Sequence, residues 1–346
     1  MRYFIFSIFL IILLISGVGL IFFFQQLFNA YEDVIASELQ AKLLELKLSE
    51  VEYSALILEK KQTTLLFCGD VMLSRSVAGQ IEKNQDYRYP FLKIAEFTEK
   101  ADLFFGNLEG PISSRGQNQG SIYSFRANPK VIEGLKFAGF DVLSLANNHI
   151  WDWGSEALED TIDILKNNDI EPVGVGKNYS EANNPVIKEI NKIKIAFFAY
   201  TNLYPESFKA DVNSSGISDF NLQKIKDKIK SLKLSQTADI VVISLHQGEE
   251  YEKQANESQK KTARELIDAG ADLIVGHHPH VVQEIEEYKK GWIAYSLGNF
   301  VFDQSFSQET MEGLILKVVI ENKIIFEVSA IKTKINSAFQ PEIIEL

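Results

Sequence analysis

The sequence predicts an α/β domain with mixed sheet content that follows an apolar helix at the N-terminus. From residue 63 onward, short apolar runs alternate with amphipathic stretches, which is typical of an α/β domain. A late run of strands around Glu321–Lys323, with few helices between them, indicates an added antiparallel part. Ahead of these elements, the chain from Tyr3 to Phe24 carries no charge. The sequence thus combines a candidate membrane segment with one large globular part.

The N-terminal apolar run is long enough to cross a bilayer, because at about 1.5 Å per residue it spans roughly 30 Å of hydrocarbon. Aromatic residues continue straight into Gln25 without a small-residue cleavage site, so we expect an uncleaved transmembrane anchor over 1–24. Arg2 on one side, against Glu32 and Asp33 on the other, places the bulk of the chain outside the cytoplasm. The expected location is the cell membrane, single-pass, with the globular domain extracytoplasmic.

Residues 25–62 contain no Gly or Pro and mix Leu, Glu, Lys and Ala, which predicts one long helix. Leu39, Leu43 and Leu46 form an apolar stripe that does not keep a strict heptad. Two roles stay open for this helix, a stalk that spaces the domain from the bilayer and a helix packed on the domain. No repeat or low-complexity linker interrupts 63–346, so we expect one domain there.

The elements of this domain follow from its apolar runs. Predicted strands cover 63–68, 102–106, 141–146, 170–175, 185–190, 194–200, 239–245, 272–276, 281–287, 292–297, 314–320 and 324–332. Predicted helices lie near 90–99, 129–138, 155–167, 220–234 and 258–269. The segment 110–121, rich in Gly and Ser, is expected to be a loop just beyond a strand end, where α/β folds place ligand-contacting loops.

Charge and composition exclude several classes of function. The chain has 35 Lys and Arg against 47 Asp and Glu, a net charge of −12, and no stretch concentrates basic residues. We therefore expect no nucleic-acid partner. A single cysteine, Cys68, excludes an intrachain disulfide and a Cys-rich zinc site, and its apolar surroundings predict a buried side chain. Nucleotide cofactors lack support, because no P-loop occurs and Tyr179 replaces the third glycine of the nearest dinucleotide fingerprint.

All five histidines lie in three short clusters, and each cluster follows an apolar run. The clusters are His149, then His246, then the group His277, His278 and His280. If the strands are parallel neighbours, these imidazoles emerge together at the carboxyl edge of a sheet, where sites in α/β folds form.

Two further strand ends carry carboxylates, Asp70 and Glu109. Asp, Glu, Asn and His from different strand ends are ligands suited to Mn, Fe or Zn. Taken alone, each has a structural alternative, such as Asp70 capping the helix that follows. Together they predict a divalent metal site with one or two ions.

These motifs resemble, in order and over roughly residues 63–310, the CapA family of poly-γ-glutamate capsule synthesis proteins. The matching segments are GDVML (69–73), GNLEG (106–110), LANNHIWDWG (145–154), GVGKN with the following EA (174–182), LHQGEEY (245–251), GHHPHVVQ (276–283) and SLGNFVFD (296–303). The family is similar in fold to calcineurin-like metallophosphoesterases. The resemblance therefore implies a two-sheet sandwich flanked by helices (α/β/β/α) that carries a binuclear metal centre.

The resemblance also implies residue roles. Metal ligands would be Asp70, Asn148, His246, His278 and His280, with Glu109 as the carboxylate that bridges two ions, and His277 as an alternative to its neighbour.

Catalytic roles would fall to His149, as the acid for the leaving group, and to Asp152, which could accept a hydrogen bond from a ligand histidine. Glu249 is a further candidate for positioning ligands. The sequence departs from the enzyme pattern at Met72, which occupies a histidine position. The number of ions, one or two, stays open, and changing Met72 to His is expected to tighten a second ion.

Two functions remain. The first is a metal-dependent hydrolase or transferase that acts outside the membrane on a phosphoester, or on an amide of an acidic polymer. The second is a non-catalytic assembly or export factor that keeps the fold. The resemblance implies poly-γ-glutamate as the polymer and membrane subunits of a capsule synthase as partners.

Overall fold

The computed structural model describes residues 26–29, 31–32, 35–40, 42 and 62–345. Its described residues between 26 and 42 are helical, and the rest of the predicted stalk up to 61 lies outside them, as does the predicted anchor over 1–24. Within the described ranges, no helix has the length and apolar character needed to span a membrane. The chain divides between Lys61 and Gln62, and the fold below is that of the second unit.

The larger sheet has eight strands in the order β16-β15-β14-β1-β2-β3-β4, with β13 paired to β1. Strands β1 to β4 are parallel, whereas β14, β15 and β16 run antiparallel, which confirms the predicted antiparallel part and joins it to the first sheet. The strands are β1 (Thr63–Val71), β2 (Leu103–Leu108), β3 (Val142–Ser144), β4 (Glu171–Val173), β13 (Asn299–Val301), β14 (Glu312–Glu321), β15 (Ile324–Ile335) and β16 (Pro341–Glu345).

The smaller sheet has six strands in the order β11-β12-β10-β9-β7-β6, and its central strands β7, β9, β10 and β12 are parallel. Its strands are β6 (Val186–Ile190), β7 (Ile193–Thr201), β9 (Ile240–His246), β10 (Leu273–His277), β11 (Ile285–Tyr288) and β12 (Gly291–Ala294). A separate pair joins β5 (Val175–Gly176) to β8 (Gly216–Ile217).

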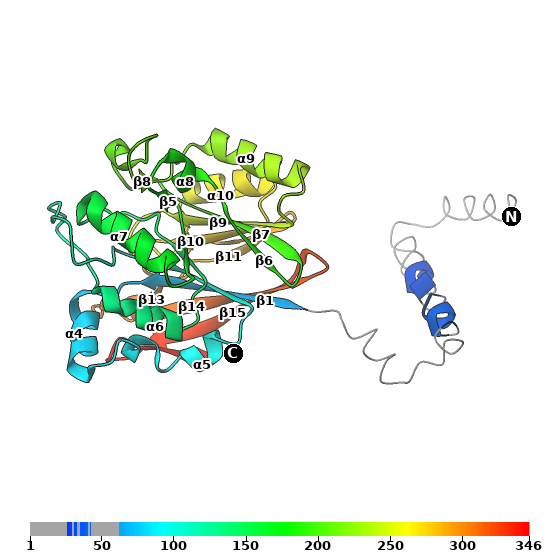
Figure 1. Ribbon diagram of the computed structural model, residues 1–346. Helices are drawn as coiled ribbons and strands as arrows, with labels where there is room; N and C mark the ends of the chain where they lie inside the picture. The colour runs from blue at the N-terminus through cyan, green and yellow to red at the C-terminus, as the bar shows by residue number, and fades with distance from the viewer. Residues whose placement is uncertain (1–25, 30, 33–34, 41, 43–61, 346) are drawn as a thin grey trace, which may run out of the picture. The chain divides into compact units, whose positions relative to one another are not determined.

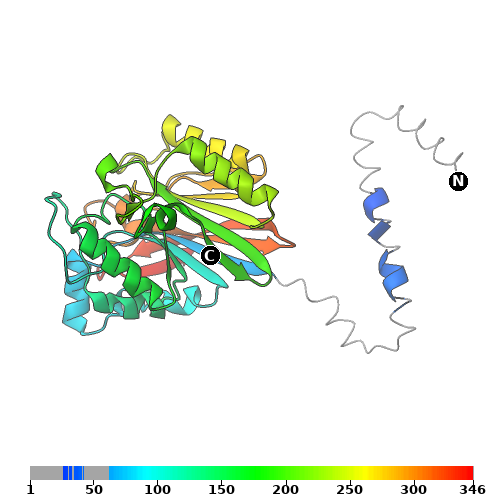
Figure 2. The same ribbon diagram turned by 45° about the horizontal axis from the view of Figure 1, so that its top comes forward.

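The two sheets pack face to face, and helices cover their outer faces (Figure 1). Between the sheets, the ring of Phe105 on β2 stacks on Phe197 of β7 at 5.8 Å between centroids. Helices α4 (Arg75–Asn84), α5 (Ala95–Thr98) and α6 (Ile132–Phe137) lie along the larger sheet, and α9 (Leu222–Leu234) and α10 (Glu257–Ala269) along the smaller one (Figures 1 and 2). The predicted two-sheet sandwich flanked by helices is confirmed.

The outer helices form where apolar spacing and capping agree. In α10, Ala263 and Leu266 are buried against the smaller sheet, and Asn256 with Gln259 forms a capping box at the N-terminus. Such a cap contributes about 1 kcal/mol. Gly270 ends the helix at a φ of 113°, a conformation that favours glycine. Packing and local signals thus specify the same boundaries.

Some elements differ from expectation. Helix α4 was not predicted, because only Val77 and Ile81 of its residues are buried and they make too thin an apolar stripe. The predicted helix over 90–99 is wrong in its continuity, since a 3₁₀ turn at Tyr89–Phe91 and the short α5 replace it. The remaining helical segments are η2 (Pro129–Val131), α7 (Gly154–Lys166), α8 (Tyr179–Asn183), η3 (Glu206–Phe208) and η4 (Glu309–Met311).

Candidate metal centre

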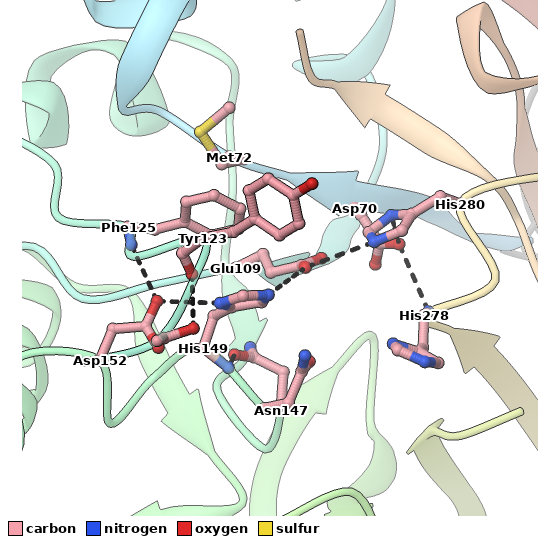
Figure 3. Close-up of polar contacts among 12 residues, drawn as sticks. Asp70, Met72, Glu109, Tyr123, Phe125, Asn147, His149, Asp152, His278 and His280 are labelled. Atoms are coloured by element: carbon pink, nitrogen blue, oxygen red, sulfur yellow. Dashed lines mark hydrogen bonds and ion pairs between the residues drawn. The ribbon is translucent and has the colours of Figure 1, made fainter. Parts of the chain in front are cut away.

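Five segments that are distant in the sequence bring polar side chains together at the carboxyl ends of the parallel strands (Figure 3). Asp70 lies on β1, and Glu109 follows β2 directly. His149 lies in the loop after β3, while His246 and His277 end β9 and β10 and face each other in register. All five side chains are buried. The predicted convergence of strand ends is therefore present in the structure.

Close backbone approach fixes the position of Asp70. A Cβ atom on the preceding Gly69 would lie 1.8 Å from the carbonyl oxygen of Gly298, so only glycine fits there. This approach lets the backbone N–H of Asp70 donate to that same carbonyl at 3.0 Å. In the sheet, Asp70 is paired with Asn107 of β2 and Asn299 of β13. The carboxylate is thus held between three strands.

Donors from both sheets surround this carboxylate. Asn107 Nδ2 donates to Asp70 Oδ1 at 2.8 Å, and the backbone N–H of His278 donates to Oδ2 at 3.3 Å. His280 Nδ1 lies 3.2 Å from Oδ2, and His277 Nδ1 lies 3.5 Å from Oδ1. Burial alone would raise the pKa of Asp70, but the close imidazoles of His277 and His280 hold it well below its ordinary value. Asp70 is therefore an anion inside the domain.

Glu109 has the opposite environment. Its carboxylate is buried, and among the described residues neither oxygen has a hydrogen-bond partner. The Nε2 atoms of His280 and His149 lie 3.6 Å and 3.8 Å from Oε1. Burial raises the pKa of Glu109 to about 7. A buried carboxylate without donors is costly unless a cation compensates it, which is the chemistry of a metal ligand.

The candidate ligand atoms form two sets within the described part of the chain. In one set, atoms of Asp70, Glu109 and His246 lie within 4.8 Å of one another, and all three residues are buried. The second set, at the same limit, joins the buried His278 and His280 to the exposed Glu250. Two carboxylates and an imidazole are a donor set that suits a divalent ion. The residues present therefore fit a divalent metal.

The histidines of the two sets differ in protonation. Burial lowers the pKa of His246 well below its ordinary value, and burial together with the charge of His280 lowers that of His278 to about 4. Both are neutral at pH 7, which is the form that binds metals. Burial would also lower the pKa of His280, but the negative charges of Glu109 and Asp70 raise it to about 9. The positive charge on His280 thus compensates the negative charges of Glu109 and Asp70, which a bound metal ion would compensate instead.

The adjacent amides of Asn147 and Asn148 have different partners. Asn147 Nδ2 donates to the carbonyl of Leu108 at 2.8 Å, and its Oδ1 accepts from the backbone N–H of His149 at 3.1 Å, so this residue fixes the loop. Asn148 Oδ1 lies 2.8 Å from His246 Nε2. The structure therefore places Asn148 beside a member of the first set, and its role as a ligand stays a prediction.

The partner of Asp152 is His149. Asp152 Oδ2 lies 2.8 Å from His149 Nδ1 and also accepts from the backbone N–H of Phe125 at 2.8 Å (Figure 3). The sequence suggested a ligand histidine as the partner of Asp152, whereas the structure pairs it with the predicted acid. Burial lowers the pKa of His149, but the hydrogen bond with Asp152 and the charge of Glu109 outweigh burial and raise it. Asp152 therefore fixes the orientation of the His149 ring, and a role for this residue in catalysis stays a prediction.

Met72 does not take part in either set. Its Sδ atom accepts hydrogen bonds from the backbone N–H and the hydroxyl of Ser74, at 3.1 and 3.0 Å. Its side chain is fully buried and is directed away from Glu109 (Figure 3). The position that lacks the expected histidine thus faces the hydrophobic core.

Sequence reasoning missed residues that line a cavity of about 150 Å³ next to His149 and His280, among them Arg75, Tyr123 and Glu250. The sequence favoured Glu249, three residues past His246 at the end of β9, but the structure groups its neighbour Glu250 with the histidines. Gly248, with a φ of 112°, turns the chain there. This glycine was the signal in the sequence that the chain turns before Glu249 and Glu250.

Comparison with known proteins shows the family to which the chain belongs. The family model described as "Bacterial capsule synthesis protein PGA_cap" matches residues 64–304, which include every candidate ligand. The chain belongs to this family. It is 34% identical over 263 residues to the capsule biosynthesis protein CapA of Bacillus anthracis, covering 74% of this chain and 64% of that protein.

A second relative is the PGA biosynthesis protein CapA of Bacillus subtilis strain 168, 34% identical over 254 residues, with 72% of this chain and 66% of that protein covered. The PGA_cap chain thus matches slightly less than two thirds of the length of both relatives. Among solved structures, a hypothetical protein from Thermus thermophilus superposes with a TM-score of 0.51 at 16% identity, covering 79% of this chain and 99% of that one. This likeness concerns the fold.

Proposed function

We propose that this PGA_cap protein is a divalent-metal-dependent hydrolase or transferase, of the metallophosphoesterase-like type, that acts in poly-γ-glutamate capsule synthesis or export. The observation that carries the proposal is the buried Glu109 carboxylate, which has no hydrogen-bond donor among the described residues and lies close to the ligand atoms of Asp70 and His246. The family match and the printed names of the relatives support the pathway. The bond would be a phosphoester, or an amide of the acidic polymer.

In this proposal Asp70, Glu109 and His246 hold one ion, with Asn148 as an added ligand. The second set would hold another ion through His278, His280 and Glu250. When bound, a divalent ion of the Mn, Fe or Zn kind would supply positive charge to the oxygen under attack and lower the pKa of a water molecule toward neutrality.

The chain itself supplies the proton for the leaving group. His149 Nδ1 donates to Asp152, which leaves Nε2 facing Glu109 and the cavity. From there Nε2 gives its proton to the oxygen or nitrogen that leaves. The ring of Phe125, 4.1 Å from that of His149, covers the imidazole and limits the access of water.

The test is the metal content of the purified full-length protein, with turnover of a phosphodiester and of a γ-linked glutamate oligomer. His246→Ala should release the ion, because protein does not easily refill an empty ligand position. His149→Ala is the matched control, which should keep the metal and lose about 10² to 10⁴ in rate. Full metal occupancy in both His246→Ala and His280→Ala would remove the metal-centre proposal.

A second candidate function is a non-catalytic assembly or export factor. The observation that favours it is Met72, which stands where the enzyme pattern has a histidine and is directed into the core. Capsule export restored in cells by His149→Ala as well as by the wild type would favour this candidate.

We further propose that residues 1–24 anchor the chain in the cell membrane, that 25–62 form a stalk, and that the domain is extracytoplasmic, next to membrane subunits of the capsule synthase. The charge-free run from Tyr3 to Phe24, preceded by Arg2, supports this topology. Protease added to spheroplasts should digest the domain, and full protection would reverse the orientation.

A further inference from the structure

The cavity beside His149 and His280 also contains a fixed guanidinium group. Arg75 begins α4 with a φ of 52°, in the left-handed region that an arginine rarely adopts. Its Nη2 atom lies 3.2 Å from Asp303 Oδ1, and the Oδ2 of this buried aspartate accepts from the backbone N–H of Ser76 at 3.1 Å. Asp303 thus binds both the side chain and the first turn of α4. The strained conformation directs Arg75 to the cavity wall.

Aromatic side chains surround this group. The guanidinium carbon of Arg75 lies 5.8 Å from the ring centroid of Tyr123 and 5.5 Å from that of Phe125, distances at which a cation is attracted to a ring. Tyr251 and Phe306 also line the cavity, with their rings 5.1 Å apart and edge to face. Tyr123 and Phe306 are 63% and 65% exposed, although large aromatic side chains are usually buried.

The pairing with Asp303 leaves the side chain of Arg75 partly exposed. The closest approach of the Arg75 guanidinium to Asp303 is that of Nη2, at 3.2 Å from Oδ1. A guanidinium has five N–H donors in a planar fork. The side chain of Arg75 is 38% exposed, whereas that of Asp303 is 1% exposed. Asp303 therefore orients the Arg75 side chain from the buried side, and the exposed part of the guanidinium stays accessible from the cavity.

We propose that Arg75 is a specificity-determining residue, which binds an oxyanion that the substrate carries beside the scissile bond. The oxyanion is a carboxylate or a phosphate, because the planar fork matches both groups through paired hydrogen bonds. Tyr123, Tyr251 and Phe306 pack against the organic chain that bears it. This inference rests on the proposed function for the position of the scissile bond, between His149 and the metal ligands.

The experiment measures binding by calorimetry on the full-length protein, after the metal content of each preparation is determined. The probes are inorganic phosphate and a γ-linked glutamate oligomer. Arg75→Ala should weaken binding of at least one probe about 10- to 100-fold, the loss expected for hydrogen bonds to a charged group. Arg75→Lys keeps the charge without the fork and should give an intermediate loss.

A matched control exists in Arg88, which pairs with Asp86 at 2.9 Å and lies 5.5 Å over the ring of Phe137. It is not among the residues that line the cavity. Arg88→Ala removes the same kind of ion pair and the same kind of ring contact, so it should bind both probes as the wild type does. Phe306→Ala should weaken the oligomer more than phosphate, since phosphate has no organic chain to pack.

Each outcome decides the inference. Loss confined to the oligomer identifies a carboxylate, and loss confined to phosphate identifies a phosphate. Arg75→Ala leaves the buried Asp303 without its ion-pair partner. If that variant does not fold, Arg75→Lys carries the comparison. Wild-type affinity in both Arg75 variants, or no binding of either probe by metal-loaded wild type, overturns the inference. If the purified wild-type protein contains no metal, the proposed function is contradicted instead. Binding that depends on Arg75 in this metal-free protein would still support the oxyanion site.

Discussion

The carboxylate of Asp152 lies 2.8 Å from the Nδ1 atom of His149, and the imidazole therefore presents Nε2 to the cavity. An ionised carboxylate accepts hydrogen bonds and does not donate them, so Nδ1 carries a proton in this pair. The same oxygen of Asp152 accepts from the backbone N–H of Phe125, which ties the loop that covers the histidine to the residue that orients it. The carboxylate of Asp152 thus orients the His149 ring and also holds Phe125, whose ring covers it.

Asp152→Asn should lower the rate about 10- to 100-fold, less than removal of the acid itself. The amide can still accept from Phe125, but it no longer stabilises the imidazolium form of His149. The loss should grow as the leaving group becomes more basic, because poor leaving groups need a proton most. Turnover of substrates with a graded series of leaving groups measures this. A loss that is equal across the series would point to a structural effect alone.

Met72→His should not raise the number of bound ions, contrary to what the sequence resemblance suggests. The native side chain is fully buried, and its sulfur accepts two hydrogen bonds from Ser74, on the side away from Glu109. An imidazole there would bury a polar ring in the core and lower the free energy of unfolding by about 1 to 3 kcal/mol. Metal stoichiometry and thermal unfolding of the variant check this. A second, tightly held ion would show that the loop can turn the side chain around.

Gly69→Ala should destabilise the domain by about 3 kcal/mol or more, and the surviving folded protein should hold less metal. The new Cβ would lie 1.8 Å from the carbonyl oxygen of Gly298, so β1 or its neighbour must move and Asp70 with it. Gly79→Ala is the matched control. Among the described residues, apart from its chain neighbours and the backbone of its own helix, no heavy atom lies within 4 Å of a Cβ there. This exposed position in α4 should gain up to about 1 kcal/mol. Chemical denaturation with metal analysis compares the two, and equal stability would refute the close-approach argument.

Asp141→Asn should stabilise the domain at pH 7, and the gain should shrink as the pH falls. Burial raises the folded-state pKa of Asp141 above its ordinary value of 3.8, although its Oδ2 accepts from the backbone N–H of Phe104 at 2.8 Å. The charged form is thus disfavoured in the fold, a penalty that is complete above the folded pKa and vanishes below 3.8, where both states are protonated.

An asparagine keeps an acceptor for Phe104 and carries no charge at any pH, so it avoids this penalty. Denaturation of both proteins between pH 7 and 4, with a chelator present throughout, isolates the effect of Asp141 from that of the candidate metal ligands. A stability difference that stays constant over this range would contradict the prediction.

Strand ends were the part of the site that the sequence could predict. Apolar runs end at Asp70, Glu109 and His246, and parallel pairing brings such ends to one edge. The directions of side chains beyond the strands could not be predicted. In a regular strand Asp70 and Met72 would point to the same side, but the pairing of β1 shifts between Asp70 and Val71 and the strand ends there. The side chain of Met72 therefore does not have to point to the same side as Asp70, as a second ligand two residues further along a regular strand would.

Arg75 and Glu250 could not be predicted for a similar reason. Both lie where the backbone has an unusual conformation. Arg75 itself has a left-handed φ, and Glu250 follows the turn at Gly248. A sequence gives residue types and spacing along regular elements, and neither feature fixes the direction of the chain at such turns. The charge that faces the cavity is therefore a property of the folded loops.

Asp70 belongs to the larger sheet and accepts a hydrogen bond from the backbone N–H of His278, which follows the end of a strand of the smaller sheet. The distance between the two sheets therefore sets the distance between the candidate ligands that each sheet carries. The rings of Phe105 and Phe197 fill the space between the sheets. Under the proposed function, a deep mutational scan should therefore separate two traits at these phenylalanines. Substitutions that preserve abundance in the cell would still abolish capsule-related fitness, whereas substitutions at apolar positions under α9 would lower both together.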